Sequence, residues 1–205
     1  MKKLAPGLML GAVFIYLYEY TDAITAPVND PLGFLGNQMS PLTPNQQIKN
    51  LNAGLKTIRH WESSDNDAKA YRMLYGGGLF NGFLDHPRNA QPMGNGQFST
   101  AAGAYQILAI SKTPQGMTKQ DTWDRIKKKL KLKDFSPASQ DAAAIELIKQ
   151  RGGYYDLING RFTSFVDKIK LEWASVPGSP YGQPRATLSA YADAFKSFGG
   201  VIENV

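Results

Sequence analysis

The sequence contains no cysteine, and only two histidines occur among its 205 residues. The chain therefore forms no disulfide bond, offers no thiolate nucleophile and cannot bind a metal through sulfur. His60 and His86 are not at the spacing of a zinc motif, and two histidines alone do not make a multi-histidine site. We predict no metal site, which leaves carboxylates as the natural candidates for chemistry.

Acidic residues are outnumbered by basic ones, and the formal net charge is +6. A basic protein favours an anionic partner, which can be a nucleic acid, a lipid surface or an acidic polymer such as the cell wall. Charge alone does not choose among these partners. The length fits one compact domain with an appendage.

Long apolar runs are rare in this sequence, and the clearest one lies at the N-terminus. Lys2 and Lys3 precede an uncharged stretch from Leu4 to Tyr18, which is typical of an export signal. The run is short beside the roughly 20 apolar residues of a spanning helix. We predict that residues 1–24 are an export signal or signal-anchor, with an apolar helix that contacts a membrane through residues 4–20. Cleavage after the signal and retention as an anchor both stay open.

A linker and then a helix follow this segment. Residues 25–44 are rich in Pro, Gly and Asn, which is typical of an irregular connection. Thr43 followed by Pro44 and Gln46 predicts a helix start, because threonine caps helices and proline suits the first turn. Apolar residues then recur at helical spacing up to Ile58. We predict that residues 45–205 form the catalytic domain.

The rest of this domain predicts a mixed fold. Residues 71–80, with three glycines at 76–78, favour a hairpin or small sheet. Helical signals begin at Ala101, and helix boundaries are indicated at residues 137–151, 162–173 and 185–198. A small β region beside a group of helices predicts an α+β fold.

Glu62 stands out among the carboxylates. It follows Trp61 at the end of the first predicted helix of the domain, four residues beyond Ile58 on or beside the inward face. The negative end of the helix dipole and partial burial beside Trp61 both raise a carboxyl pKa, as a general acid requires. A solvated charge at a frayed helix end is the alternative interpretation.

Several segments resemble one known family in their order along the chain. They are Trp61-Glu62-Ser63, Gly77-Gly78-Leu79-Phe80, Asp85-His86-Pro87-Arg88, Ser99 to Leu108, Leu132 to Asp141, Ile148 to Gly152, and Trp173 to Gly178 with Tyr181-Gly182-Gln183. The ordered set, over residues 47–202, is similar to the phage lambda endolysin family of lytic transglycosylases. The resemblance implies a lysozyme-like, mainly helical fold with a small β-sheet.

The resemblance also implies that Glu62 is the single catalytic glutamate of an enzyme without a cofactor. Such enzymes cleave the β-1,4 bond between N-acetylmuramic acid and N-acetylglucosamine in peptidoglycan and form a 1,6-anhydro ring. Phage lysozymes pair their glutamate with an aspartate about nine residues on, where this sequence has Tyr71. We therefore favour a lytic transglycosylase, with a hydrolytic muramidase as the alternative.

Substrate-binding residues follow from the same resemblance. Tyr105 and Gln106 correspond to a Tyr-Gln pair at the start of a helix that lines the substrate cleft, and the amide of Gln106 can both donate to and accept from sugar groups. Tyr181 and Gln183 are expected on the opposite wall, where an aromatic ring suits a sugar face. Their alternative role is packing within the loop.

Three further groups of residues are assigned by local chemistry. Ser99 and Thr100 are candidate sugar ligands, although we favour a capping role for them at a following helix. Residues 85–88 favour a structural role, through an Asx turn and the extended residue before Pro87. The basic run at 127–133 indicates the solvated face of a short helix.

The whole pattern predicts a monomeric phage endolysin that binds peptidoglycan strands, contacts the membrane and does not bind nucleic acid. Its N-terminal run resembles a signal-anchor-release segment, so the expected location is the host inner membrane and then the periplasm. A virion-associated wall-penetrating transglycosylase is one alternative. An inactive, wall-binding membrane protein on the same fold is the non-enzymatic alternative.

Overall fold

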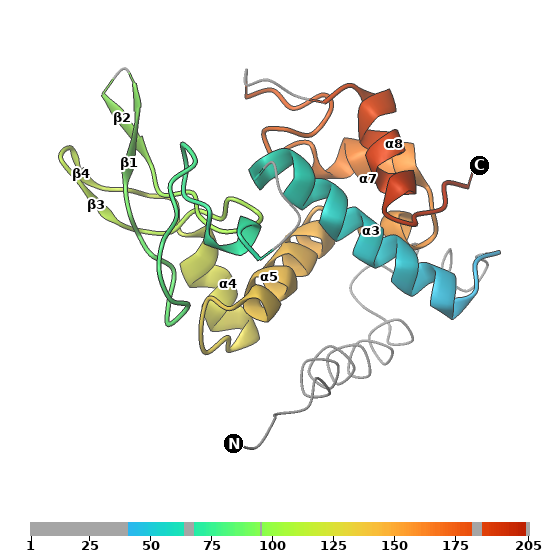
Figure 1. Ribbon diagram of the computed structural model, residues 1–205, viewed down its shortest axis with the longest axis horizontal. Coiled ribbons are helices and arrows are strands. Elements are labelled where there is room, and N and C mark those ends of the chain that lie inside the picture. The colour runs from blue at the N-terminus through green and yellow to red at the C-terminus, as the bar shows by residue number, and fades with distance from the viewer. Residues whose placement is uncertain (1–40, 64–67, 95, 182–185, 204–205) are drawn as a thin grey trace, which may run out of the picture. The chain divides into compact units, whose positions relative to one another are not determined.

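The computed structural model describes residues 41–63, 68–94, 96–181 and 186–203 (Figure 1). The predicted membrane segment at residues 4–20 and nearly all of the predicted linker lie outside these ranges. Within them, no helix combines the length and the apolar character needed to cross a membrane.

The domain begins with the long helix α3, Pro44–Ser63. The Thr43 hydroxyl accepts the backbone N–H of Gln46 at 3.3 Å, which confirms the predicted cap. The apolar face of α3 packs on α6, Tyr154–Ile158, and on α8, Leu188–Ser197. Gly54 permits the contact with α6, because a Cβ at this position would lie 2.6 Å from a methyl carbon of Leu157.

Two small antiparallel hairpins form the β part of the fold and lie together beside α4 in Figure 1. In the first, β1, Gln91–Gly94, pairs with β2, Gln97–Ser99. In the second, β3, Lys112–Thr113, pairs with β4, Gly116–Met117. Each hairpin is a separate two-stranded sheet, so the β content is as small as predicted.

The predicted hairpin at residues 71–80 is wrong in its details. The segment holds a short 3₁₀ helix, η1, Ala70–Arg72, followed by a single bridge between Met73 and Leu79. The glycine turn itself is confirmed, because Gly76 and Gly77 both adopt positive φ angles. Among the described residues, continuous strands begin at β1, downstream of this segment.

The helices after this region begin later than predicted. Residues 101–121 contain turns, bridges and the β3–β4 hairpin but no helix, so the helical expectation from Ala101 is wrong. The observed elements are α4, Thr122–Leu130; α5, Pro137–Gln150; α6; α7, Phe162–Ile169; and α8. Ser136 caps α5 as expected, whereas α7 stops four residues before Trp173 and α8 starts three residues after Arg185.

The segment after α8 returns to the first helix of the domain. The Asn50 amide on α3 donates to the carbonyls of Ile158 at 3.2 Å and Val201 at 3.1 Å. The Val201 N–H donates back to Asn50 Oδ1 at 2.8 Å. Because Asn50 is fully buried, its amide satisfies three backbone groups that water does not reach.

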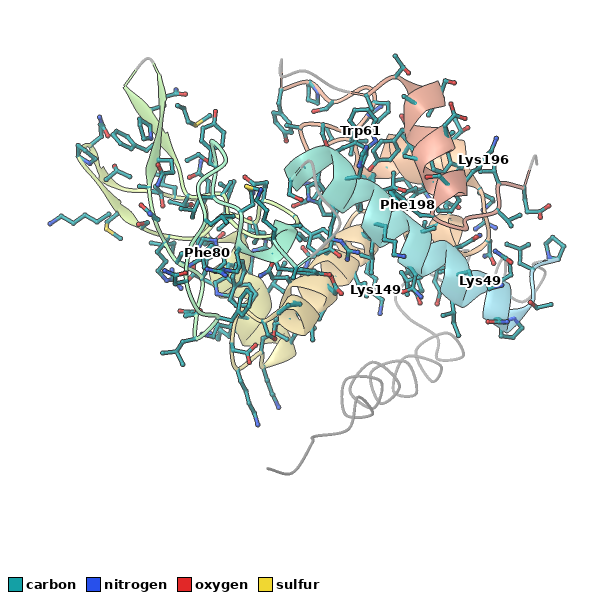
Figure 2. All side chains as sticks on the ribbon, viewed as in Figure 1. Lys49, Trp61, Phe80, Lys149, Lys196 and Phe198 are labelled. Atoms are coloured by element: carbon teal, nitrogen blue, oxygen red, sulfur yellow. The ribbon has the colours of Figure 1, made fainter. Side chains whose placement is uncertain are left out.

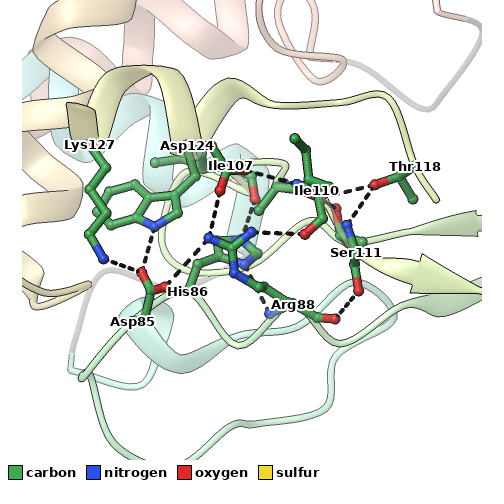
Figure 3. A network of polar contacts seen from close by, with 12 residues as sticks. Asp85, His86, Arg88, Ile107, Ile110, Ser111, Thr118, Asp124 and Lys127 are labelled. Atoms are coloured by element: carbon green, nitrogen blue, oxygen red, sulfur yellow. Dashed lines mark hydrogen bonds and ion pairs between the residues drawn. The ribbon is translucent and has the colours of Figure 1, made fainter. Parts of the chain in front are cut away.

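Residues 85–88 form a polar network on α4 (Figure 3). Asp85 accepts from the indole N–H of Trp123 at 2.8 Å and from Lys127 at 2.9 Å. Arg88 donates to Asp124 at 2.6 Å. These bonds hold the irregular segment against α4, which supports the structural interpretation. The basic run at 127–133 is largely exposed, as predicted, except that Lys127 is half-buried and pairs with Asp85.

His86 lies buried in this network. Its Nε2 contacts the carbonyl oxygen of Ile107 at 2.8 Å, and its Nδ1 accepts the Arg88 N–H at 3.0 Å. The ring packs edge-on against Phe135 at a centroid distance of 4.8 Å. Since one nitrogen must donate and the other accept, the neutral imidazole fits this position.

Candidate active site

One pocket of about 820 Å³ opens beside the C-terminal turn of α3. Its wall comes from the end of α3, the segments around the β1–β2 hairpin, the start of α4, the end of α5 and the loop after α7. The lining residues are Glu62, Ser63, Met73, Leu74, Tyr75, Gly76, Gly77, Met93, Phe98, Ser99, Ala101, Gln106, Leu108, Gln120, Thr122, Arg151, Leu171, Glu172, Trp173, Ala174 and Tyr181. This mixture of apolar surface and a few polar groups is typical of a ligand site.

Glu62 lies in the last turn of α3 and lines this pocket. Its Oε1 accepts a hydrogen bond from the backbone N–H of Ser175 at 3.2 Å and a second from the Ser175 hydroxyl. Across the part of the chain that the structure describes, no cation pairs with this carboxyl group. One carboxyl oxygen is thus fixed in place by Ser175.

Burial raises the pKa of Glu62, and the two hydrogen bonds from Ser175 lower it by less. Burial disfavours the ionised form because water no longer solvates the charge. A raised pKa keeps a larger fraction of the carboxyl group protonated near neutral pH, which suits a general acid. The half-buried carboxyl group and its bonds to Ser175 favour the general-acid interpretation of Glu62 over a solvated charge at a frayed helix end.

Aromatic rings surround the end of α3. Trp61 stacks on Tyr191 of α8 with a centroid distance of 6.5 Å and an interplanar angle of 29°. Figure 2 shows Trp61 at the end of α3 that lies next to α8. Burial, and then the Glu62 charge, raises the pKa of the fully buried Tyr191. Aromatic side chains therefore lie beside Glu62 on the α8 side.

A second carboxyl group, Glu172, also lines the pocket. Its Oε2 accepts from Nε of Arg151 at 2.8 Å, and Arg151 also donates to the carbonyl of Leu171. This ion pair balances the charge of Glu172. Glu62 is consequently the one lining carboxylate, among the described residues, that has no cationic partner.

Gln106 lines the pocket, as expected for a substrate ligand. It does not start a helix, because it lies in a turn with a φ of 46°, which is uncommon for a residue other than glycine. Its amide nitrogen donates to the carbonyl of Gly103 at 3.0 Å. This bond orients the amide, and no donor to its oxygen is found among the described residues.

Tyr105 and Thr100 lie in the core and not in the pocket wall. The Tyr105 hydroxyl donates to Asp141 at 2.6 Å. The Thr100 hydroxyl donates to the carbonyl of Ala109 at 2.8 Å and accepts its N–H at 3.1 Å. Neither residue lines the pocket, so the structure does not bring these two candidate substrate ligands to the pocket wall, and Thr100 caps no helix among the described residues.

Ser99 does line the pocket, but it caps no helix. Its hydroxyl accepts the N–H of Ala101 at 3.2 Å within a turn. Tyr181 lines the pocket from the opposite loop, with 55% of its surface exposed, and its hydroxyl donates to the carbonyl of Leu171 at 2.8 Å. Gln183 lies outside the described residues.

Ser175 is the site residue that sequence reasoning missed. It lies 113 residues from Glu62 in the sequence, and no local pattern marks it as a partner of a carboxylate. It belongs to the Trp173–Gly178 segment whose order along the chain suggested the family. Its place in that segment was the signal in the sequence that could have indicated Ser175.

The fold agrees with solved lysozymes. It is similar to bacteriophage lambda lysozyme complexed with a chitohexasaccharide, with a TM-score of 0.65 and 32% identity over 79% of this chain and 99% of that chain. A second structure of the lambda lysozyme matches with a TM-score of 0.64 and 32% identity, over 76% of this chain and 97% of that chain. The predicted α+β, lysozyme-like fold class is confirmed.

The domain is thus that of a lysozyme-like enzyme acting on peptidoglycan. More particularly, the sequence pattern of the Endolysin family matches residues 52–202, and the chain belongs to this family. It is 33% identical to the endolysin of Escherichia phage lambda over 165 residues, covering 78% of this chain and 98% of the relative. It is 36% identical to the endolysin of Escherichia phage P2 over 128 residues, covering 60% and 71%.

Proposed function

We propose that this endolysin is a lytic transglycosylase whose single acid and base is Glu62. The observation that carries the proposal is the state of this carboxyl group: half-buried at the pocket, held by Ser175, and without a cationic partner among the described residues. Its raised pKa suits the proton donor that a glycosidic bond needs in order to break.

The reaction has two proton transfers at one residue. Protonated Glu62 gives its proton to the oxygen that leaves as the bond between N-acetylmuramic acid and N-acetylglucosamine breaks. Positive charge develops at the anomeric carbon during this step. Ionised Glu62 then takes the proton from the C6 hydroxyl of the muramic acid, whose oxygen bonds to the anomeric carbon and closes the 1,6-anhydro ring. The enzyme ends with Glu62 protonated again.

Charge in the pocket favours this route over hydrolysis. Hydrolytic enzymes of this type use two carboxylates, one of which is a nucleophile or activates water. The second lining carboxylate here, Glu172, is paired with Arg151 at 2.8 Å. Tyr71, at the sequence spacing of the phage lysozyme aspartate, is buried and donates to Asp141. An internal hydroxyl as the attacking group does not need a second carboxylate.

The substrate is a peptidoglycan glycan strand in the pocket. The solved lambda relative holds a chitohexasaccharide, a polymer of the same β-1,4 sugar class. In this chain the amide of Gln106, which lines the pocket, suits an acetamido group, and the exposed ring of Tyr181 suits a sugar face. Ser99 offers a hydroxyl beside them.

Replacement of Glu62 by glutamine tests the catalytic role. Glu62→Gln keeps an acceptor for Ser175 but cannot transfer a proton, so lysis of purified peptidoglycan sacculi should be lost while the thermal midpoint changes little. Glu146→Gln is the matched control, because Glu146 pairs with Lys129 and does not line the pocket. Lysis by the purified Glu62→Gln protein would refute the proposal.

Mass spectrometry of the digested sacculi tests the reaction type. Anhydro-muropeptides, lighter than hydrolysis products by one water, are the expected result. Reducing ends would instead identify a hydrolytic muramidase. The absence of any product would favour a wall-binding protein without activity.

The N-terminal segment is proposed to deliver the enzyme through the host inner membrane to the periplasm. The support is the sequence: two lysines precede the uncharged run from Leu4 to Tyr18. Fractionation of expressing cells should find the full-length chain first in the membrane and later, after depolarisation, in the soluble periplasm. A shortened soluble form from the outset would show ordinary signal cleavage.

A further inference from the structure

A cluster of three donors meets at one oxygen of Asp141 on α5. Asp141 Oδ1 accepts from the hydroxyls of Tyr71 at 2.8 Å and Tyr105 at 2.6 Å, and from Nη1 of Arg59 at 3.3 Å. The two tyrosines and Arg59 are buried. None of the four residues lines the pocket.

Arg59 completes the cluster from α3. Its Nη1 donates to the hydroxyls of Tyr71 at 2.6 Å and Tyr105 at 3.1 Å. Its guanidinium carbon also lies over both rings, at 5.2 Å and 5.9 Å from their centroids. Such geometry adds a cation–π attraction to the hydrogen bonds. The buried cation, two hydroxyls and one carboxylate thus form one connected network.

Each donor residue lies within three positions, in the sequence, of a residue that lines the pocket. Arg59 is one helical turn before Glu62 on α3. Tyr71 precedes the lining segment that begins at Met73, and Tyr105 precedes the lining residue Gln106. The cluster therefore fixes the helix that carries Glu62 relative to two segments of the opposing wall.

We propose that Asp141 is a positioning residue of the active site, which holds Glu62 and the two wall segments in register through Arg59, Tyr71 and Tyr105. This inference rests on the proposed catalytic role of Glu62. Loss of the Asp141 charge leaves the buried Arg59 without its counter-ion, a change that a packed interior relieves by movement. A displacement of about 1 Å at a reacting group costs on the order of a hundredfold in rate.

The cluster should also make turnover depend on pH. Burial raises the pKa of Asp141, and its bonds to Tyr105, Arg59 and Tyr71 oppose this. The groups that face it are Arg59 from α3, Tyr71 from η1 and Tyr105 from the turn before Gln106, and burial also raises the pKa of both tyrosines, which stay protonated. As pH falls, Asp141 is the group of this cluster that takes up a proton. Its negative charge is then lost, so turnover should fall on the acid side.

The test compares full-length wild type with Asp141→Asn, Tyr71→Phe and a matched control, Asp156→Asn. Asp156, which is more buried than the part-exposed Asp141, also forms ion pairs, to Arg161 at 2.7 Å and Lys168 at 2.6 Å, and it does not line the pocket. Release of dye from labelled sacculi between pH 4 and 8 gives kcat and KM for each protein, and thermal unfolding gives their stability.

We expect Asp141→Asn to lower kcat by about tenfold to a hundredfold with a change in KM of less than about threefold. Its kcat profile should lack the acid limb of the wild type. Tyr71→Phe, which removes one donor and keeps the ring, should lower kcat in the same direction by less. Asp156→Asn should lose stability while it keeps the wild-type kcat and acid limb.

Three results would overturn the inference: a wild-type kcat in Asp141→Asn, a loss confined to KM, or an unchanged acid limb. If Asp141→Asn does not fold, an unchanged kcat in Tyr71→Phe overturns it instead. Failure of the proposed function is a separate result, because it appears as lysis by Glu62→Gln, whatever the Asp141 variants do.

Discussion

Replacement of His86 by glutamine is expected to flatten the acid-side loss of stability in this domain. Burial lowers the pKa of His86 from 6.5 to about 4. In the fold its Nδ1 must accept the N–H of Arg88, and a proton on that nitrogen would turn the acceptor into a second donor. The unfolded chain has no such restriction, so it binds the proton at higher pH.

The sign and size of this change in the free energy of unfolding follow from the difference in proton binding between the folded and unfolded states. Between pH 6.5 and 4 the unfolded state binds more protons than the folded state, so the free energy of unfolding falls as pH falls. The interval from 6.5 to about 4, at about 1.4 kcal/mol per pH unit, gives a loss of about 3 kcal/mol. This loss is complete below the folded pKa and absent above 6.5.

Urea unfolding at steps between pH 7.5 and 4.5 measures this loss. Glutamine cannot take up the proton, but its amide can donate to Ile107 and accept from Arg88 in place of the ring. Burial in the aromatic cluster is reduced in His86→Gln, so its stability should be lower throughout and vary less with pH. Parallel curves for the wild type and the variant would refute the reasoning.

Two further substitutions test other contacts. Ser175→Ala removes one of the hydrogen bonds that lower the pKa of Glu62, so that pKa should rise; the basic limb of the lysis profile should move to higher pH, and an unmoved limb would contradict this role. Gly54→Ala places a Cβ 2.6 Å from a Leu157 methyl carbon, so urea unfolding should show a loss of about 1–3 kcal/mol; Asn52→Ala, on the exposed face of α3, should show no such loss.

Local sequence chemistry predicts much of this fold. Thr43 and Ser136 cap α3 and α5 where their sequences predict helix starts. Glu62 lies at the helix end where the spacing placed it. These features depend on residues within a few positions of each other, because a cap or an apolar face is set by the nearest turn.

The errors come from contacts between distant segments. Residues 101–109 contain Ala, Tyr and Leu, which tolerate helices, yet Ala102 pairs with both Leu74 and Ile107. Tyr105 was predicted to face substrate, and its hydroxyl is instead directed to Asp141, 36 residues away. The direction of such side chains is decided by tertiary pairing, which overrides local propensity.

The bond between Asn50 and Val201 also bears on when the enzyme becomes active during its synthesis. The amide of Asn50 has its complete set of backbone partners only once residue 201 has left the ribosome. Ser175, which fixes Glu62, is made 113 residues after it. At about 5–20 residues per second, the ribosome needs several seconds or more to reach Ser175 after it has made Glu62. Until then the Glu62 carboxyl group lacks its hydrogen bonds from Ser175. We therefore expect a nascent chain that stalls in this interval to carry the proposed acid, Glu62, without the hydrogen bonds from Ser175.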